Sequence, residues 1–313
     1  MTAHPSAIPV IDLEESFSSS LERRKRVAAE VRSACRDIGF FYVRNHGVPE
    51  TLIAATLETS RRFFAKPAAA KMQLLGAGGF GYDPPQRQVL DAAAPPDLKE
   101  GFMMGVTENA LARTTKWPAD MPELRERLHD YEAHLRELGR HLVRCIALSL
   151  DLPEDYFDAG YERASCSVRL LHYAPRPAAA PPNQLGAGAH TDWGAITMLH
   201  QDGVGGLEVL GADGEWIAAT PIPGTFVINL GDMIRRWTND RYRSTLHRVV
   251  SGTADRHRYS IATFFNPSED FRVVCVPTCL AADETPIYPP CTVGEHIMEM
   301  MRKTYGSALA GRA

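Results

Sequence analysis

From residue 165 onward the chain is a succession of short apolar segments separated by turn-forming residues. These segments are rich in β-branched and aromatic side chains and are bounded by Gly, Pro or Asp, a pattern typical of β-strands. They cover residues 166–173, 195–200, 207–210, 215–218, 225–230, 246–251, 258–265 and 271–276. Short strands at such regular spacing favour a β-sandwich or a jelly-roll barrel.

The first half of the chain is dominated by helical periodicity instead. Within residues 120–150 the apolar side chains recur in alternating steps of three and four, which places them on one face of a long helix. Further helices are expected over residues 20–36, 50–65 and 292–305, and short strands over residues 8–13 and 40–43. The pattern as a whole predicts a mainly β fold with flanking helices, in which a helical N-terminal part packs on a barrel.

We expect these parts to form one compact unit. Residues 1–160 would be the helical and strand-containing N-terminal region, and residues 161–313 the barrel core with a C-terminal helix. The Ala- and Pro-rich residues 174–188 are interpreted as a loop within the barrel. Residues 76–96, rich in Gly, Ala and Pro, are expected to be loop, because the glycines at 76–81 lack the GxGxxG spacing of a nucleotide site.

Composition excludes several classes of function. The net charge is −4, from 34 basic and 38 acidic residues, and no basic face is concentrated enough to predict a nucleic-acid partner. No apolar run of about 18 residues predicts a membrane span, and the N-terminus shows no secretory signal. Six scattered cysteines are typical of a reducing compartment, so we expect a cytoplasmic protein. The sequence leaves the oligomeric state open.

The segment around residue 190 places an imidazole and a carboxylate together. His190 and Asp192 are two residues apart, so in an extended strand their side chains lie on the same face. His247 follows in a second strand-like run. Two histidines and one carboxylate on one face of an octahedral ion leave three positions open, the arrangement of oxygen-activating Fe(II). A turn histidine bonded to nearby backbone is the alternative for His190.

A third element follows His247 in the chain. Arg258 and Ser260 share a strand face inside an apolar run that should be mostly buried. A buried arginine requires a partner, and its guanidinium fork binds a carboxylate through two directional, charge-assisted bonds. We therefore expect this pair to bind the carboxylate of a small molecule.

The ordered pattern His190-x-Asp192, His247, Arg258-x-Ser260 resembles the Fe(II)/2-oxoglutarate-dependent dioxygenases, specifically the isopenicillin N synthase-like branch. The resemblance extends over nearly the whole chain. It includes the residues 8–13, 39–48, 97–102, 229–232 and 242–249. Each stretch alone is weakly specific, but the combination is highly specific.

The resemblance implies a double-stranded β-helix (jelly-roll) fold and the use of Fe(II), 2-oxoglutarate and O₂. By position, His190, Asp192 and His247 would be the catalytic iron ligands. Arg258 and Ser260 would bind the distal carboxylate of 2-oxoglutarate. The family often has Asn-Tyr-Tyr-Pro before the metal motif, whereas residues 172–175 here read His-Tyr-Ala-Pro; His172 is expected to replace the family's asparagine as a contact to the co-substrate.

The function that the resemblance implies is oxidation of a small-molecule substrate, by default hydroxylation, with release of succinate and CO₂. Two alternatives belong to the same branch: an oxidase that catalyses desaturation or ring closure without 2-oxoglutarate, and an ethylene-forming enzyme. A non-catalytic metal-binding barrel is the alternative from another class. A zinc hydrolase is disfavoured, because no general base accompanies the three metal ligands.

Substrate contacts are predicted from position along the strands. Phe264 is in step with the Arg258-x-Ser260 pair and should face the barrel interior, either as a substrate contact or as a plain core aromatic. Three residues after a turn at 231–232 are expected on the rim of the pocket: Met233, Arg235 and Trp237. Residues 76–96 and 97–106 are candidates for a lid.

Overall fold

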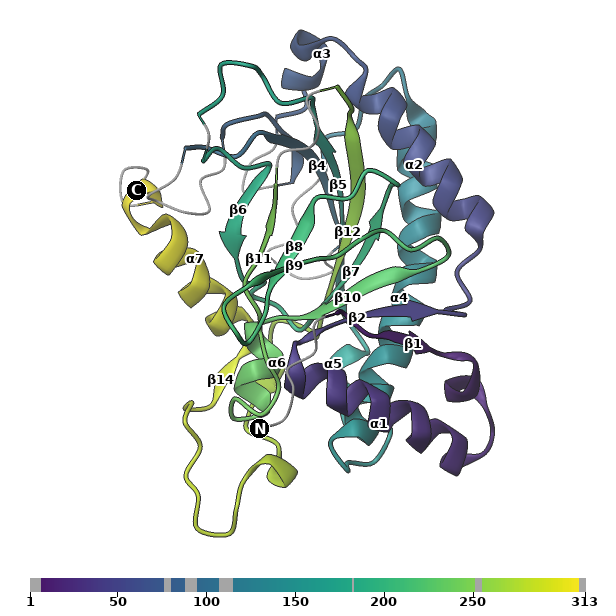
Figure 1. Cartoon of the computed structure of the whole chain (residues 1–313), viewed down its shortest axis with the longest axis vertical. Coiled ribbons are helices and arrows are strands. Elements are labelled where there is room, and N and C mark those ends of the chain that lie inside the picture. Colours follow the sequence, from purple (N-terminus) through teal and green to yellow (C-terminus); the bar gives the residue numbers. More distant parts are fainter. Residues whose placement is uncertain are drawn as a thin grey trace.

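Two β-sheets face each other and enclose the interior of a barrel in the computed structural model (Figure 1). The structure describes residues 7–75, 80–87, 95–106, 115–181, 183–250 and 255–309, with side chains as far as residue 303. In spatial order the larger sheet contains β1 (Val10–Asp12), β2 (Phe40–Arg44), β10 (Phe226–Leu230), β7 (Ile196–Gln201), β12 (Arg258–Asn266), β5 (Ser165–Tyr173), β4 (Lys99–Val106) and β3 (Gly81–Asp83).

The smaller sheet provides the opposite wall. Its strands in spatial order are β6 (Ala187–His190), β11 (His247–Val249), β8 (Leu207–Leu210) and β9 (Trp216–Ala218). A separate ribbon joins β13 (Arg272–Val273) to β14 (Cys291–Thr292). Because β1 to β4 hydrogen-bond into the same sheet as β5, β7, β10 and β12, the two halves of the chain build one sheet together.

The helices cover the outer face of the larger sheet. The long α4 (Pro122–Ser149) lies behind this sheet, with α1 (Leu21–Asp37) and α2 (Glu50–Phe64) packed against it (Figure 1). The remaining helices are α3 (Ala68–Met72), α5 (Asp158–Tyr161), α6 (Asp232–Trp237) and α7 (Val293–Leu309), with 3₁₀ turns at Glu14–Phe17 and Pro277–Cys279.

Alternation along the central strands divides the apolar residues between two cores. On β5, Val168 and Leu170 pack in the large core between the sheet and the helices. Leu171 and Tyr173 pack in a smaller cluster with Ala187, Val209 and Val249, which lines the barrel interior. Successive side chains of a strand point to opposite faces, so odd-numbered residues of β5 face the interior.

Most predicted elements are confirmed, including the helices over 20–36, 50–65 and 120–150.

The lid prediction for residues 97–106 is wrong, because most of this segment is β4, hydrogen-bonded to both β3 and β5. Within residues 76–96, expected to be loop, residues 81–83 form β3; the stretches 76–79 and 88–94 lie outside the described residues. The strand expected over 271–276 is reduced to β13, and β6 begins inside the expected loop 174–188. The division into residues 1–160 and 161–313 stays a prediction.

Packing of α4 should account for much of the stability. Leu135 is fully buried in the large core, whereas Leu21, at the start of α1, is 42% exposed. We expect Leu135→Ala to lower the free energy of unfolding by about 2–5 kcal/mol, because it leaves a cavity. Leu21→Ala is the matched control and should change it by about 0.5 kcal/mol or less. Urea denaturation measures both, and equal effects would contradict this account of the core.

Candidate active site

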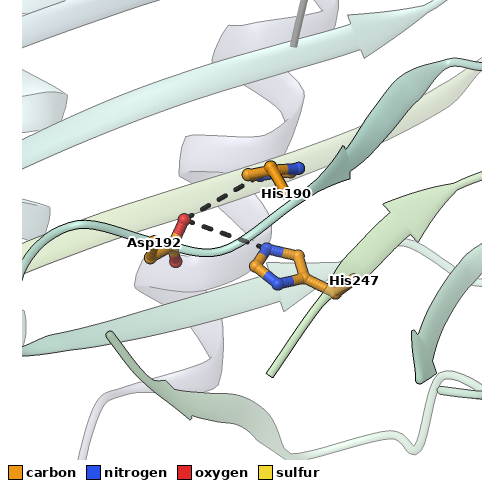
Figure 2. Close-up of side chains that lie close together, drawn as sticks. All are labelled: His190, Asp192 and His247. Carbon is orange, nitrogen blue, oxygen red and sulfur yellow. Dashed lines mark ion pairs between the residues drawn. The ribbon is translucent and has the colours of Figure 1, made fainter. Parts of the chain in front are cut away.

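Three side chains converge where the two sheets meet (Figure 2). His190 ends β6, Asp192 follows it in the turn to β7, and His247 begins β11 directly opposite His190. The Asp192 Oδ1 atom lies 3.9 Å from His190 Nε2 and 3.8 Å from His247 Nε2. One ligand atom from each residue lies within 4.8 Å of the others. The predicted triad is therefore assembled, from strands that are far apart in sequence.

Backbone hydrogen bonds fix the orientation of both imidazole rings and the proton on Nδ1. The Nδ1–H of His190 donates to the Gly188 carbonyl (2.8 Å), and the Nδ1–H of His247 donates to the Thr245 carbonyl (3.1 Å). Each ring therefore carries its proton on Nδ1 and presents the lone pair of Nε2 toward Asp192. Metal-binding histidines are oriented in this way.

The Asp192 carboxylate is held by one oxygen. Its Oδ2 accepts hydrogen bonds from Thr197 Oγ1 (2.6 Å) and from Asn229 Nδ2 (2.8 Å). These donors lie on neighbouring strands β7 and β10 of the larger sheet. Oδ1 is left facing the two Nε2 atoms, so the three potential ligand atoms point at one another. Two neutral imidazoles and one carboxylate are the ligand set of a mononuclear Fe(II) site.

Electrostatics favour a cation at this point. Burial and the nearby His247 lower the pKa of His190 to about 3, so its imidazole is neutral near pH 7. Burial acts to raise the pKa of Asp192, but the two histidines and the hydrogen bonds from Asn229 and Thr197 outweigh burial, and the net pKa is lowered. A carboxylate anion facing two imidazole nitrogen atoms suits a divalent metal ion.

A buried cation lies on the adjacent wall of the interior. Arg258 is 1% exposed, and its guanidinium donates to the Gly205 carbonyl (2.5 Å), Ser260 Oγ (3.2 Å) and Gln201 Oε1 (3.1 Å). The guanidinium lies over the ring of Tyr173, 4.6 Å from its centroid. The Tyr173 side chain is also a hydrogen-bond partner of Arg258, so the partners of the guanidinium among the described residues are all neutral groups. No described carboxylate pairs with Arg258, and a desolvated cation requires an anion.

His172 is not brought to this site. It is paired with Tyr259 across β5 and β12, whereas Tyr173 is paired with Arg258 and faces the interior. His172 lies on the helix side of the sheet, where it bonds Glu100 Oε1 (2.7 Å) and His257 Nδ1 (2.8 Å). The geometry gives no support to a contact between His172 and 2-oxoglutarate. The register of β5 with β12 places Tyr173, not His172, on the face of Arg258.

The residues predicted to contact the substrate lie in different parts of the structure. Phe264 packs against the interior cluster, on the strand face of Arg258 and Ser260, as expected. Met233 and Trp237 are wrong as rim residues, since they are 0% and 2% exposed in the large core and cannot border an opening. Arg235 is bound to Asp240 at the surface through Nε and Oδ1 (2.8 Å). All three lie on α6, a helix that is not among the elements predicted from the sequence.

Two charged pairs of the interior were not anticipated. Lys99 of β4 is directly opposite Tyr173 and forms a buried ion pair with Asp97. Arg169 of β5, opposite Ala262, forms an ion pair with Asp83 of β3 (2.9 Å). Residues opposite each other in antiparallel strands share a face, so both cations belong to the interior wall. Residues 97–106 had been taken as a lid, and this hid the strand alternation that indicates Lys99.

Comparison with known proteins assigns the class. The C-terminal half, residues 164–267, matches the 2OG-Fe(II) oxygenase superfamily. Residues 8–124 match the N-terminal region described as non-haem dioxygenase in morphine synthesis N-terminal. The chain therefore belongs to the 2-oxoglutarate-Fe(II) oxygenases and is a 2-oxoglutarate-dependent dioxygenase that uses Fe(II). The predicted jelly-roll fold is confirmed by solved structures of this family.

Individual relatives align with this chain over nearly all of their length. The 2-oxoglutarate-Fe(II) type oxidoreductase hxnY of Emericella nidulans is 35% identical, over 98% of this chain and 93% of that protein. Homoarginine-6-hydroxylase 2-ODD-C23 of Glycine max is 30% identical, over 98% and 96% respectively. A full-length Neurospora crassa protein, crystallised with alpha-KG and thymine, superposes with a TM-score of 0.88 at 29% identity, covering 95% of this chain and 97% of that one. Among the described residues, none of the helices has both the length and the apolar character needed to cross a bilayer.

The lowered histidine pKa values predict acid sensitivity of the metal-free protein. Between pH of about 6.5 and 3 the unfolded chain protonates His190 but the folded protein does not, so the free energy of unfolding should fall as pH falls through this range. His200, whose pKa burial lowers to about 4, acts in the same direction. Urea denaturation at a series of pH values measures the slope. His190→Gln should reduce it, and a slope identical to that of the unsubstituted protein would contradict the prediction.

Proposed function

We propose that His190, Asp192 and His247 bind Fe(II) and that Arg258 and Ser260 bind the distal carboxylate of 2-oxoglutarate. One observation carries this proposal: a convergent set of two Nε2 atoms and Oδ1 faces the same interior as a buried arginine without a counter-ion among the described residues. The donor types fit Fe(II), and the buried guanidinium of Arg258, which has only neutral partners among the described residues, fits one carboxylate. When bound, Fe(II) would activate O₂, and 2-oxoglutarate would supply two electrons and be converted to succinate and CO₂, so that the second oxygen atom would oxidise the substrate.

The protein's own residues bind, orient and exclude water. The Arg258 fork fixes the direction of the co-substrate's carboxylate, and Gln201 and Tyr173 fix the guanidinium in turn. Ser260 accepts from Arg258, so its hydroxyl proton is free to donate to the same carboxylate. The apolar cluster around these residues keeps the interior dry, which strengthens each electrostatic contact.

The reaction that we propose is hydroxylation of a small organic molecule. Support comes from the relatives: a homoarginine hydroxylase, the Neurospora crassa protein with bound thymine, and JOX2 with bound JA. JOX2 superposes with a TM-score of 0.82 at 32% identity, over 94% of this chain and 84% of that one. Phe264 supplies an aromatic wall for such a substrate, and the Arg169–Asp83 pair supplies polar groups at the same interior face.

The compartment that we propose is the cytoplasm. All six cysteines are free, and four of them are buried: Cys35, Cys145, Cys166 and Cys279. A reducing environment preserves such thiols, and the Fe(II) state is preserved there as well.

The experiment that tests the function measures succinate release and substrate mass together. The protein is incubated with Fe(II), 2-oxoglutarate, O₂ and a panel of small metabolites. A product heavier by one oxygen, with succinate formed only when 2-oxoglutarate is added, is the expected result. Loss of two hydrogens without any need for 2-oxoglutarate would instead establish the oxidase alternative, and ethylene release would establish the ethylene-forming one.

Substitution of a metal ligand should abolish turnover. We expect His190→Ala and His247→Ala each to lower succinate formation by about 10³-fold or more, because the metal's contribution to the barrier is several kcal/mol. The control is His129→Ala, a histidine on α4 outside the site, which should retain full activity. Circular dichroism should show that all three variants fold. Full activity in either ligand variant would disprove the metal assignment.

The co-substrate site is tested separately with Arg258→Lys. A lysine keeps the charge but cannot make two parallel bonds to a carboxylate. We expect the KM for 2-oxoglutarate to rise by about 10-fold or more, with a smaller change in kcat. Arg24→Lys, which alters the surface pair with Glu154, is the control. An unchanged KM in Arg258→Lys would place the carboxylate elsewhere.

A further inference from the structure

The segment that precedes β4 lies along the segment that carries the first metal-site histidine. Leu98 N donates to the Leu185 carbonyl (3.1 Å), and Gln184 Nε2 donates to the Pro96 carbonyl (2.9 Å). One side chain extends this contact, because Asp97 Oδ1 accepts the backbone N–H of Gly188 (2.9 Å). Residues 96–98 therefore hold the start of β6 at three points.

The contact at Gly188 leads directly to the metal site. The carbonyl of Gly188 accepts the Nδ1–H of His190, the bond that leaves Nε2 free to bind a metal ion. The N–H that Asp97 binds belongs to the peptide group before Gly188, and the carbonyl that binds His190 belongs to the peptide group after it, so the two hydrogen bonds meet at one residue. A displacement of Gly188 therefore changes the direction in which the His190 ring points.

The position of β6 explains why a side chain is needed here. In the described part of the molecule β6 is the edge strand of the smaller sheet and pairs with β11 alone. That pairing is irregular, with a register shift between His247 and Val249. An edge strand lacks a neighbour that would bind its outward peptide groups. The Asp97 carboxylate accepts the Gly188 N–H in the place where a carbonyl of a neighbouring strand would otherwise accept it.

The carboxylate is itself held by Lys99. Asp97 and Lys99 are 2% and 7% exposed, and their side chains form an ion pair inside the protein. A buried ion pair contributes little net stability compared with apolar residues of similar size. It does impose one orientation on both partners, which is what a fixed acceptor for Gly188 requires.

We infer that Asp97 and Lys99 are positioning residues of the metal site, which set the orientation and tautomer of His190 by fixing the backbone of Gly188. This inference rests on the proposed function, since it takes His190 as an Fe(II) ligand. Lys99 acts on Asp97, Asp97 on Gly188, and Gly188 on His190.

Two double variants isolate the Gly188 bond. Asp97→Asn/Lys99→Met removes both charges but keeps a side-chain oxygen for Gly188, whereas Asp97→Leu/Lys99→Met removes both charges and the oxygen. Titration of the metal-free proteins with Co(II), followed by its visible absorption, gives the dissociation constant. We expect the Asn variant to remain within about 3-fold of the unsubstituted protein and the Leu variant to bind about 10-fold more weakly, as for other residues that orient a metal ligand.

The control variant removes an ion pair next to His247, the second histidine of the metal site. Glu208 pairs with Arg248, the neighbour of His247, through Oε2 and Nε (2.7 Å), but makes no bond to the acceptor of the His247 proton. Glu208→Gln should leave Co(II) affinity unchanged. Equal affinities for the Asn and Leu double variants would overturn the inference.

A measurement on the unsubstituted protein serves if the Leu variant does not fold. The Gly188 amide should exchange slowly with solvent although β6 is an edge strand, and ¹⁵N shifts should show the His190 proton on Nδ1. Fast exchange at Gly188 would overturn the inference. Failure of the proposed function has a different signature: the unsubstituted protein would then bind Co(II) no better than His190→Ala.

Discussion

The Asp192 carboxylate is the point on which the arrangement of the active site depends. Asp192 follows β6 of the smaller sheet, yet its Oδ2 is held by Thr197 and Asn229 of the larger sheet. Its backbone carbonyl also accepts the N–H of Asp232 at the start of α6 (2.8 Å). One residue thereby joins both sheets and a helix. These contacts hold the carboxylate with Oδ1 toward the Nε2 atoms of the two histidines.

Of the three cationic side chains on the interior wall, two have carboxylate partners and one has none among the described residues. Lys99 and Arg169 already have carboxylate partners, in Asp97 and Asp83 respectively. Arg258 has none among the described residues, although it is the most deeply buried of the three. A charge in a medium of low polarity attracts a counter-ion strongly. The interior is therefore prepared for one anionic co-substrate at one place.

The helix-facing side of β4 and β5 explains why residue 172 is a histidine, where the family often has an asparagine. There Glu100 accepts hydrogen bonds from His172, Tyr82 and Lys71, and Lys71 also bonds the Phe64 carbonyl (2.9 Å). This buried network ties β3, β4 and β5 to the helices. Its polar groups are satisfied by one another, which a buried network requires. His172 thus acts in the support of the barrel rather than in its interior.

Much of the site could be predicted from the sequence, because strand alternation is a local property. The spacing Arg258-x-Ser260 fixes which side chains share a face of β12, and Phe264 follows from the same count. The motif His190-x-Asp192 indicated the ligand types, although β6 ends at His190 and Asp192 lies in the turn after it. Periodicity also indicated the helical N-terminal part and the barrel class. A wrong element assignment, however, removes this information. The lid prediction for residues 97–106 conceals Lys99, and without α6 the sequence places Met233 and Trp237 on a rim instead of in the core.

Only the tertiary structure decided which faces meet. Whether the His172 face or the Tyr173 face of β5 looks into the barrel depends on its register with β12, and register is set by packing across the whole sheet. The same holds for the bond from Asp97 to Gly188, which joins residues separated by 91 positions. The sequence by itself determined the types of the ligands and their local spacing. Closure of the two sheets brought His247 to Asp192, and no local pattern specifies that contact.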